Sequence, residues 1–452
     1  MITGADDTIF ALATAPGRAA LAVVRITGPG AKEVLLNLTR SIPPPRYAAV
    51  RRLVEPVSRE TLDQAMVLWM PGPASFTGED VVELHLHGGA AVTSAVLETL
   101  AGLGLRPAGP GEFTRRAFEH GKLDLTEAEA VADLIDADSA AQRRQALRQL
   151  TGSTTAVVSG WRTRLIEALA SLEAAIDFPD EELPTEVGAR ARRPLLALAE
   201  DLRAAAADLR GDRVRDGYRI ALVGAPNAGK SSILNGLIGR EAAIVTEVAG
   251  TTRDVVEQPL ELSGYRVLLA DTAGLRETGE RIEAEGIRRA RAWAEGADLR
   301  LWIVDRSDDG EAWRSALDVL RQGDLLVLNK ADRPEGSALP AVMSAGDALE
   351  WEPVDASAID PDGLTELKAA LERRIIRDLG GGEPIAATRL RHRLLLAEAA
   401  EHVQRALADG LGDPELMAED VRLAARSLEA MTGRVDTEAV LDAIFLEFCI
   451  GK

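Results

Sequence analysis

The sequence has little cysteine, few aromatic residues and no long apolar run. Its one cysteine, Cys449, excludes an intrachain disulfide and any zinc or iron–sulfur site built from several cysteines. No run of about 18 apolar residues occurs, so we expect no membrane-spanning helix. No basic stretch precedes an apolar one at the start, unlike a secretory signal. We therefore expect a cytoplasmic protein without a membrane partner.

An excess of positive charge is also missing. The chain has 52 Lys and Arg residues against 72 Asp and Glu residues, a net charge of −20. Because nucleic-acid backbones attract basic surfaces, this balance argues against non-specific nucleic-acid binding. Residues 1–121 are nearly neutral, so the acidity lies in the rest of the chain. The local basic stretches Arg143–Arg144 and Arg389–Arg393 are candidate contacts for a nucleic-acid partner, although solvated helix faces are the preferred interpretation.

Four stretches of different texture follow one another along the chain. Residues 1–121 mix short apolar runs with Gly and Pro, which predicts an α+β domain. Residues 122–216 are rich in Ala, Leu, Glu and Arg with helical periodicity. Residues 217–379 alternate strand and helix patterns, as in a mostly parallel sheet. Helical texture returns in residues 380–452, so we expect an α/β domain inserted into a helical domain.

Within these stretches the pattern predicts individual elements. The strands expected in the α+β stretch are Leu21–Ile26, Gln64–Trp69 and Val81–Leu86, with one helix over 90–101. The helices expected in the helical stretch cover 126–150, 161–177 and 187–210. The strands expected in the α/β stretch are Tyr218–Val223, Tyr265–Ala270, Leu299–Val304, Asp324–Leu328 and Glu352–Val354.

A phosphate-binding motif joins the first of these α/β strands to a helix. Gly224–Ser231 fits G-x-x-x-x-G-K-[ST] in the strand–loop–helix setting that the motif requires. Its glycines let backbone N–H groups surround the phosphates. Lys230 is expected to reach the β- and γ-phosphates, and the Ser231 hydroxyl to ligate Mg²⁺.

Three further motifs follow at the ends of predicted strands. Asp271–Gly274 offers a carboxylate to Mg²⁺ and an N–H group to the γ-phosphate. In Asn329–Asp332, the Asp332 carboxylate can accept from two N–H groups of guanine, whereas adenine presents the opposite pattern. Ser357–Ala358 can contact the guanine oxygen. Four ordered motifs predict a Ras-like P-loop GTPase domain.

The sequence has a candidate first switch but lacks the glutamine that orients the attacking water in Ras-like enzymes. Thr246–Asp254 is the expected first switch, in which Thr252 offers a hydroxyl to Mg²⁺. Leu275 stands where Ras-like enzymes have the glutamine that orients water. Oxygen atoms of Asn227 and of the switch could hold a monovalent cation that stabilises developing charge instead. The residues predicted to contact GTP are Asn227, Ala228, Gly229, Lys230, Ser231, Ser232, Thr246, Glu247, Val248, Ala249, Gly250, Thr251, Thr252, Asp271, Thr272, Ala273, Gly274, Asn329, Lys330, Asp332, Ser357 and Ala358.

Over nearly its whole length the sequence resembles the MnmE (TrmE) family of tRNA modification GTPases. The matching stretches are Pro16–Arg18, Arg25–Gly28, Phe76–Asp80, His87–Gly89, Pro110–Phe113, Lys122–Leu125, Asp177–Asp180, Gly250–Asp254 and Phe448–Lys452. The resemblance implies a homodimer joined by N-terminal domains that bind 5,10-methylene- or 5-formyl-tetrahydrofolate. It also implies potassium-dependent GTP hydrolysis and a flavoprotein partner, MnmG. Together the two proteins would modify carbon 5 of the tRNA wobble uridine with an aminomethyl or carboxymethylaminomethyl group.

The resemblance further assigns roles to individual residues. Folate binding falls on Arg25, Glu83, Lys122 and Lys452. Potassium ligation falls on Asn227, Thr246, Val248 and Thr251, and magnesium ligation on Ser231 and Thr252. The glutamate that orients the attacking water falls on Glu283, with Glu285 as a rival, and Cys449 matches a cysteine needed for modification.

Alternatives remain at two levels. Cys449 is either a reactive thiol near the folate or a buried inert one. The whole protein is either this enzyme or a GTP-controlled regulatory or ribosome-assembly switch whose flanking domains perform no chemistry. Folate binding by the N-terminal part would separate the two functions.

Overall fold

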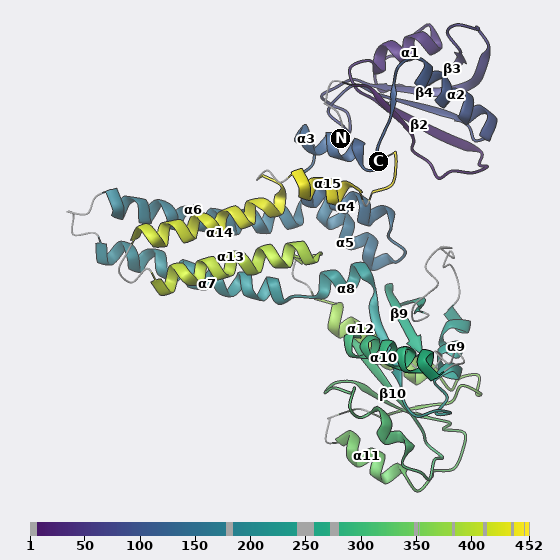
Figure 1. The fold of residues 1–452 in the computed structure, drawn as a ribbon, viewed down its shortest axis with the longest axis vertical. Coiled ribbons are helices and arrows are strands. Elements are labelled where there is room, and N and C mark those ends of the chain that lie inside the picture. The colour runs from purple at the N-terminus through teal and green to yellow at the C-terminus, as the bar shows by residue number, and fades with distance from the viewer. Residues whose placement is uncertain are drawn as a thin grey trace. The chain divides into compact units, whose positions relative to one another are not determined.

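The chain divides into two compact units. One comprises Met1–Ile135, Leu147–Leu202 and Leu395–Lys452, and the other Asp136–Ala146 and Arg203–Leu394. The computed structural model describes residues 7–177, 184–241, 257–271, 280–347, 351, 353–381, 385–409, 414–434, 438–446 and 448–451. Figure 1 shows the course of the chain.

The first unit begins with a six-stranded sheet in the order β3-β4-β5-β2-β1-β6. Only β6 pairs in parallel, with β1; the other neighbours are antiparallel. The strands are β1 (Ile9–Leu12), β2 (Leu21–Thr27), β3 (Ala49–Val54), β4 (Thr61–Met70), β5 (Val81–His87) and β6 (Arg106–Pro107). The associated helices are α1 (Ala31–Thr39), α2 (Ala90–Gly102) and α3 (Glu112–Glu119).

Alternation along these strands separates the two faces of the sheet. Leu84 of β5 and its strand neighbours pack with Leu35 of α1 and Leu100 of α2 in one core. On β1, Phe10 belongs to this core, whereas its neighbours Ile9 and Ala11 point to the opposite face and pack against Phe113 at the start of α3. The beginning of α3 is thereby fixed beside β1.

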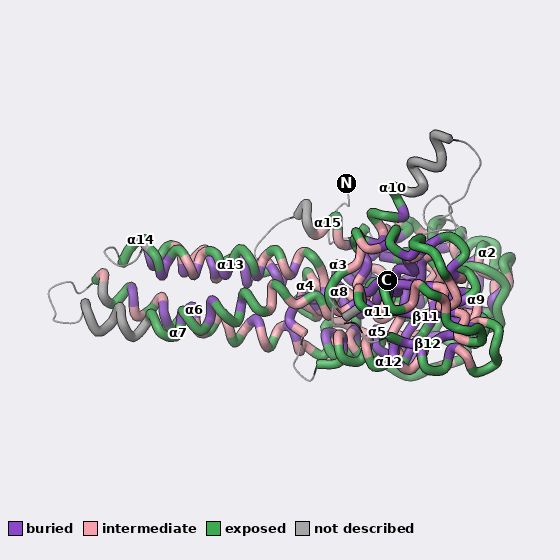
Figure 2. The backbone as a smooth tube through the Cα atoms, turned by 90° about the horizontal axis from the view of Figure 1, so that it is seen from below, coloured by how far each residue is buried: buried purple, intermediate pink, exposed green. Residues whose placement is uncertain are grey.

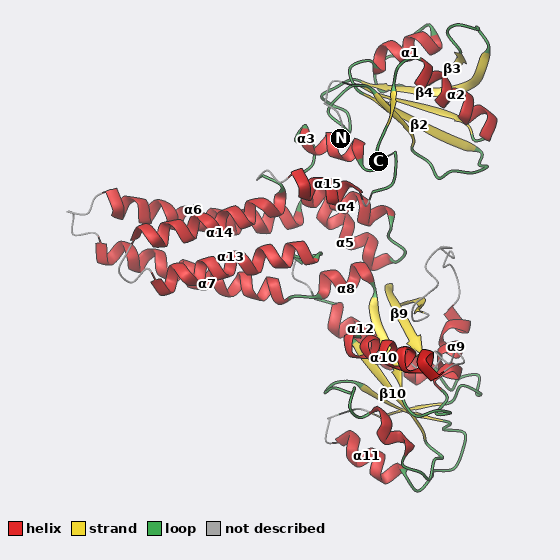
Figure 3. Cartoon of the chain, in the orientation of Figure 1, coloured by secondary structure: helices red, strands yellow, loops and turns green. Residues whose placement is uncertain are grey.

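Helices that precede and follow most of the second unit in sequence form the rest of the first unit. They are α4 (Leu125–Ile135), α6 (Ser153–Asp177), most of α7 (Pro184–Ala207), most of α13 (Leu390–Asp409), α14 (Pro414–Thr432) and α15 (Glu438–Leu446), and none of the described segments among them is a strand (Figure 3). Arg162 of α6 pairs with Glu429 of α14 at 2.7 Å, and Arg422 with Glu173 at 3.0 Å. Buried residues line the facing sides of these helices (Figure 2). Segments before and after the second unit therefore build one helical layer.

The second unit contains a six-stranded sheet in the order β12-β11-β10-β7-β9-β8. All its pairs are parallel except β8 with β9. The strands are β7 (Tyr218–Val223), β8 (Glu257–Leu262), β9 (Tyr265–Asp271), β10 (Leu299–Asp305), β11 (Leu325–Asn329) and β12 (Pro353–Ala356). The helices are α5 (Ala140–Leu150, in part), α8 (Arg210–Asp216), α9 (Lys230–Glu241), α10 (Glu280–Gly296), the 3₁₀ helix η1 (Ala312–Ala316), α11 (Leu339–Asp347) and α12 (Thr365–Leu379).

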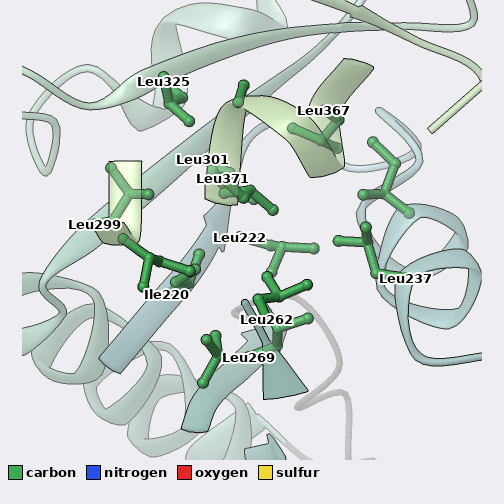
Figure 4. Close-up of a cluster of buried hydrophobic side chains, with 14 of the residues drawn as sticks. Ile220, Leu222, Leu237, Leu262, Leu269, Leu299, Leu301, Leu325, Leu367 and Leu371 are labelled. Atoms are coloured by element: carbon green, nitrogen blue, oxygen red, sulfur yellow. The ribbon is translucent and has the colours of Figure 1, made fainter. Parts of the chain in front are cut away.

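Apolar residues cover both faces of this sheet, as expected for parallel strands. Leu222, Leu269 and Leu301 belong to the core shown in Figure 4, which also includes residues of α9 and α12. Trp302 and Val304 alternate onto the opposite face. The predicted fold class, an α+β domain and a helical domain interrupted by a Ras-like α/β domain, is confirmed. Among the described helices, none is both long and apolar enough to cross a membrane.

The helix predicted over 126–150 is wrong in one respect, because α4 and α5 are separate helices. Ser139 and Gln142 form a capping box before α5: the Gln142 N–H donates to Ser139 Oγ at 3.3 Å, and the Ser139 N–H to Gln142 Oε1 at 2.9 Å. These bonds satisfy the N–H groups that a continuous helix would pair internally.

Candidate functional site

The phosphate-binding motif lies between β7 and α9, with its loop pressed against the neighbouring strands. Gly229 has φ +97°, and a Cβ there would lie 2.0 Å from Nδ2 of Asn329. Asn329 itself donates from Nδ2 to the Ala228 carbonyl at 2.7 Å. Only glycine fits this approach, which links the phosphate loop to the end of β11.

Lys230 is held inside the curl of the same loop. Its residue is 4% exposed, and Nζ donates to the carbonyl oxygens of Gly224 and Ala225, each at 2.8 Å. A buried ammonium group requires such acceptors. The contacts fix the charge where the motif is expected to receive nucleotide phosphates.

Two side chains with oxygen atoms suited to Mg²⁺ lie together where α9 begins and β9 ends. The Ser231 hydroxyl hydrogen-bonds to the Asp271 carboxylate. Hydroxyl and carboxylate oxygens are ligands that Mg²⁺ prefers beside nucleotide phosphates, so this pair fits the predicted magnesium position. Ser232, the next residue, is exposed on the first turn of α9.

The predicted base-recognition residues are also brought together. The Ser357 hydroxyl donates to Asp332 Oδ1 at 2.9 Å, joining the motifs after β11 and β12. Lys330 lies between Asp305, at 2.5 Å, and the Asn227 carbonyl, at 3.2 Å. Burial alone would raise the pKa of Asp305, but hydrogen bonds from Lys330 and Ser307 hold that pKa below its usual value.

Ala358 packs against the sheet core beside this site, and Ala228 is buried in it. Several predicted residues lie outside the described part of the chain: Thr246, Glu247, Val248, Ala249, Gly250, Thr251, Thr252, Thr272, Ala273, Gly274 and Lys452. Glu283 and Glu285 lie on α10, but their side chains also fall outside the described set, so the choice between them stays open.

The predicted folate residues Arg25 and Glu83 face one another across β2 and β5. Arg25 donates to Glu83 Oε1 from Nη2 at 2.9 Å and from Nε at 3.1 Å, and His85 Nε2 lies 3.3 Å from Glu83 Oε2. The Arg25 guanidinium also lies 5.7 Å from the ring centroid of Phe76 and 5.8 Å from that of Phe113. The result is a half-buried charged group close to two aromatic rings.

Lys122 reaches the same loop as Phe76, since its Nζ donates to the Pro73 carbonyl at 2.9 Å. The C-terminal segment lies beside β1 and the start of α3. Ile450 forms a β-bridge with Pro110, and a Cβ on Gly451 would lie 2.4 Å from the carbonyl oxygen of Leu12 on β1. Cys449 is exposed, so the buried alternative for this thiol is wrong.

An ion-pair network centred on Arg116 and Arg106 was not predicted from the sequence. Arg116, which is nearly fully buried, contacts Asp7 at 2.5 Å, Glu79 at 3.1 Å and Glu112 at 3.2 Å. Arg106 bridges Asp7 at 2.7 Å and Glu112 at 2.5 Å. The network ties the first strand, the 72–80 loop and α3 together. Glu79 and Glu112 lie inside the stretches that resemble the family, Phe76–Asp80 and Pro110–Phe113, which is the sequence signal that points to them.

Of the two basic stretches, Arg389–Arg393 is engaged within the second unit. Arg393 pairs with Asp212 at 2.6 Å, and Arg391 Nη2 lies 3.1 Å from Nε2 of the buried His392. Arg143 and Arg144 are exposed on α5. The stretch Arg389–Arg393 therefore has partners within its own unit.

Comparisons with known proteins cover the entire chain. The family model "GTP-binding protein TrmE N-terminus" matches residues 8–122, and the "MnmE helical domain" model matches residues 125–449. The tRNA modification GTPase MnmE of Phenylobacterium zucineum is 58% identical over 99% of this chain and 100% of its own length. That of Caulobacter vibrioides is 56% identical with the same coverage. The chain therefore belongs to the MnmE family and is a GTP-hydrolysing enzyme of tRNA modification.

Proposed function

We propose that this enzyme modifies carbon 5 of the tRNA wobble uridine, using a tetrahydrofolate one-carbon donor and potassium-dependent GTP hydrolysis. Full-length family membership is the observation that carries the proposal. We infer that it acts in the cytoplasm as a homodimer with the flavoprotein MnmG. We also propose that residues 1–121, 122–216, 217–379 and 380–452 are its functional domains.

The surroundings of Arg25 support the folate proposal. Glu83 offers carboxylate oxygens to the N–H groups of a pterin ring, while the exposed Phe76 ring offers apolar surface beside the charge. The folate would supply the one-carbon unit. The chain's residues would bind and orient it, and the exposed Cys449 thiol lies on the segment that meets β1.

Isothermal titration of the full chain with 5-formyl-tetrahydrofolate tests the folate site. Arg25→Gln should weaken binding at least tenfold, because it removes the charge that holds Glu83. Arg51→Gln, on another strand of the same sheet, is the matched control and should bind normally. If the unmodified chain shows no binding, the regulatory-switch alternative gains support and the folate proposal fails.

The phosphate loop supports the potassium proposal. Asn227 has φ +65°, its side chain is exposed, and its carbonyl already accepts from Lys330. An amide oxygen beside the phosphates fits a monovalent cation, which would neutralise charge developing in the transition state. Its further proposed ligands are Thr246, Val248 and Thr251. Ser231 and Thr252 are the proposed Mg²⁺ ligands, and Asp271 would hold the ion through water.

GTP turnover in KCl and in NaCl tests the cation. Hydrolysis should be fast only in KCl, and Asn227→Ala should remove the difference between the two salts. Asn235→Ala, on α9 and away from the loop, should keep that difference. Equal turnover of the unmodified enzyme in both salts would refute the potassium role and leave GTPase activity intact.

The chemical product is tested separately. In a strain lacking the gene, mass spectrometry of tRNA nucleosides should show loss of the carbon-5 modification, and the wild-type gene should restore it. Restoration by a gene encoding Lys230→Ala would contradict a role for GTP hydrolysis. Unchanged nucleosides in the deletion strain would refute the proposed reaction.

A further inference from the structure

A concentration of arginine surrounds β3 at the edge of the N-terminal sheet. Residues 40–59 contain five arginines and one acidic residue, in a chain whose net charge is −20. β3 is the last strand of its sheet, so one side of it has no neighbouring strand (Figure 1). We name the five residues the β3 basic edge; they are Arg40, Arg46, Arg51, Arg52 and Arg59.

These arginines differ from Arg106 and Arg116 of the same domain in their partners. Within the described part of the chain, none of the five forms a salt bridge with a carboxylate. Arg51 donates only to the Ser41 hydroxyl at 3.1 Å and to a backbone carbonyl. By contrast, Arg106 and Arg116 contact two or three carboxylates each. Arg59 has one electrostatic partner, Glu55, so positive charge is available chiefly on the other four residues of the β3 basic edge.

The backbone does not explain why arginine stands at these positions. Arg40, Arg46 and Arg59 have φ of 59°, 65° and 66°, in the left-handed region that favours glycine or asparagine. Local structure alone would select one of those smaller residues.

The chemistry of the surface identifies the class of partner. Guanidinium groups bind phosphates with two parallel hydrogen bonds and stack on bases. Tyr47, next to Arg46, is 69% exposed and offers a ring for such stacking. A six-residue strand spans about 20 Å. A double-stranded nucleic acid presents on the order of ten phosphates over that length.

We propose that the β3 basic edge contacts the phosphate backbone of the tRNA substrate. The proposal rests on the family's action on tRNA and is independent of the folate and potassium proposals. The acidic remainder of the chain repels other parts of the tRNA, so the contact is local and sensitive to salt. Charged edge strands also prevent sheet-to-sheet association, and this alternative makes a different prediction.

The test measures binding of fluorescently labelled tRNA to the full chain by anisotropy at several KCl concentrations. The double variant Arg46→Gln/Arg52→Gln should raise Kd about tenfold and lower the slope of log K against log salt by about 1.5, since two phosphate contacts disappear. Tyr47→Leu should weaken binding without changing the slope. Arg405→Gln/Arg422→Gln, with the same charge change on α13 and α14, should leave both quantities within about twofold.

Each other outcome overturns the proposal. One is equal Kd and slope in the two double variants. A second is self-association of Arg46→Gln/Arg52→Gln in light scattering with unchanged tRNA affinity, which would assign the arginines to edge protection. A third is sedimentation of the chain with phosphatidylserine vesicles without any tRNA binding. GTP hydrolysis, measured on the same samples, should be unchanged in every variant. Because β3 belongs to the other unit, unchanged thermal melting in circular dichroism is the measurement that shows the variants are folded.

Discussion

The buried ion pair between Arg300 and Asp324 should be a major stabilising contact of the GTPase unit. Their side chains are 5% and 2% exposed, and Arg300 Nε lies 2.7 Å from Asp324 Oδ2. Asp324 also accepts from the backbone N–H groups of Arg300 and Arg321, at 3.0 and 2.6 Å. Arg300 in turn donates to the Ala294 and Ala297 carbonyls at the end of α10.

The geometry sets the expected magnitude. Asp324→Leu leaves a guanidinium without its carboxylate in a dry site, which costs about 3–5 kcal/mol. For a domain of this size, with a urea m-value of about 2 kcal/mol/M, the unfolding midpoint should fall by about 1.5–2.5 M. The double variant Arg300→Met/Asp324→Leu removes the stranded charge. It should be more stable than Asp324→Leu alone, but not wild-type, because two carbonyls lose their donor.

Tryptophan fluorescence provides the assay. Trp302 lies two residues beyond Arg300, with ring centroids 5.9 Å from Trp313 and 5.1 Å from Trp351, so this cluster reports on the GTPase unit. The transition belonging to that unit is the one that added GDP shifts upward. Glu311→Ala, an exposed acid of the same unit, should leave the midpoint unchanged. The reasoning is refuted if Asp324→Leu shifts the midpoint no more than this control, or if the double variant is less stable than Asp324→Leu.

Three further predictions follow from described contacts. Asp332→Asn should weaken GTP binding by at least a hundredfold and favour xanthosine triphosphate, which competition binding measures; unchanged preference would contradict guanine recognition. Burial and a hydrogen bond to Asp378 raise the pKa of Tyr218 above its usual value of 10.0. The protonated hydroxyl therefore contributes fully to folding stability below pH 10, and this contribution is lost as pH rises through the raised pKa. Tyr218→Phe should flatten the resulting alkaline fall in melting temperature, and an unaltered fall would contradict the linkage. Trp293 Nε1 donates to Glu257 at 2.8 Å, joining α10 to β8. Trp293→Phe and Glu257→Ala should each lower kcat for GTP about three- to tenfold at constant KM, whereas Glu257→Gln, which keeps an acceptor, should not.

The parallel strands of the GTPase unit were predictable because they are continuous apolar runs bounded by motifs. Tyr218–Val223 is reproduced without change, and the strand predicted at Leu299–Val304 ends one residue later. β8 was missed because Glu257–Leu262 alternates weakly and contains Pro259 at the sheet edge. β3 escaped for a similar reason, since two arginines interrupt its apolar pattern.

The sequence predicted residues of the nucleotide site better than their mutual contacts. Motif spacing identified Asn329 and Asp332, because their chemistry is local to one strand end. It could not show that Asn329 anchors the phosphate loop, since that bond joins residues 101 positions apart. The contacts of Arg116 with Glu79 and Asp7 are equally non-local, and helical periodicity does not distinguish this arginine from an exposed one.

The anchoring of α10 shows how such distant contacts bear on catalysis. The last turn of the helix is fixed by Arg300 and by Arg321, whose Nη2 donates to the Glu295 carbonyl at 2.6 Å. Glu283 lies eleven residues before Ala294, which is about 16 Å along the axis of α10. A tilt of about 4° at the anchored end would therefore displace the Glu283 backbone by about 1 Å, enough to reduce turnover about a hundredfold if Glu283 orients the water. Loss of the anchor should consequently lower kcat even in conditions where the unit remains folded.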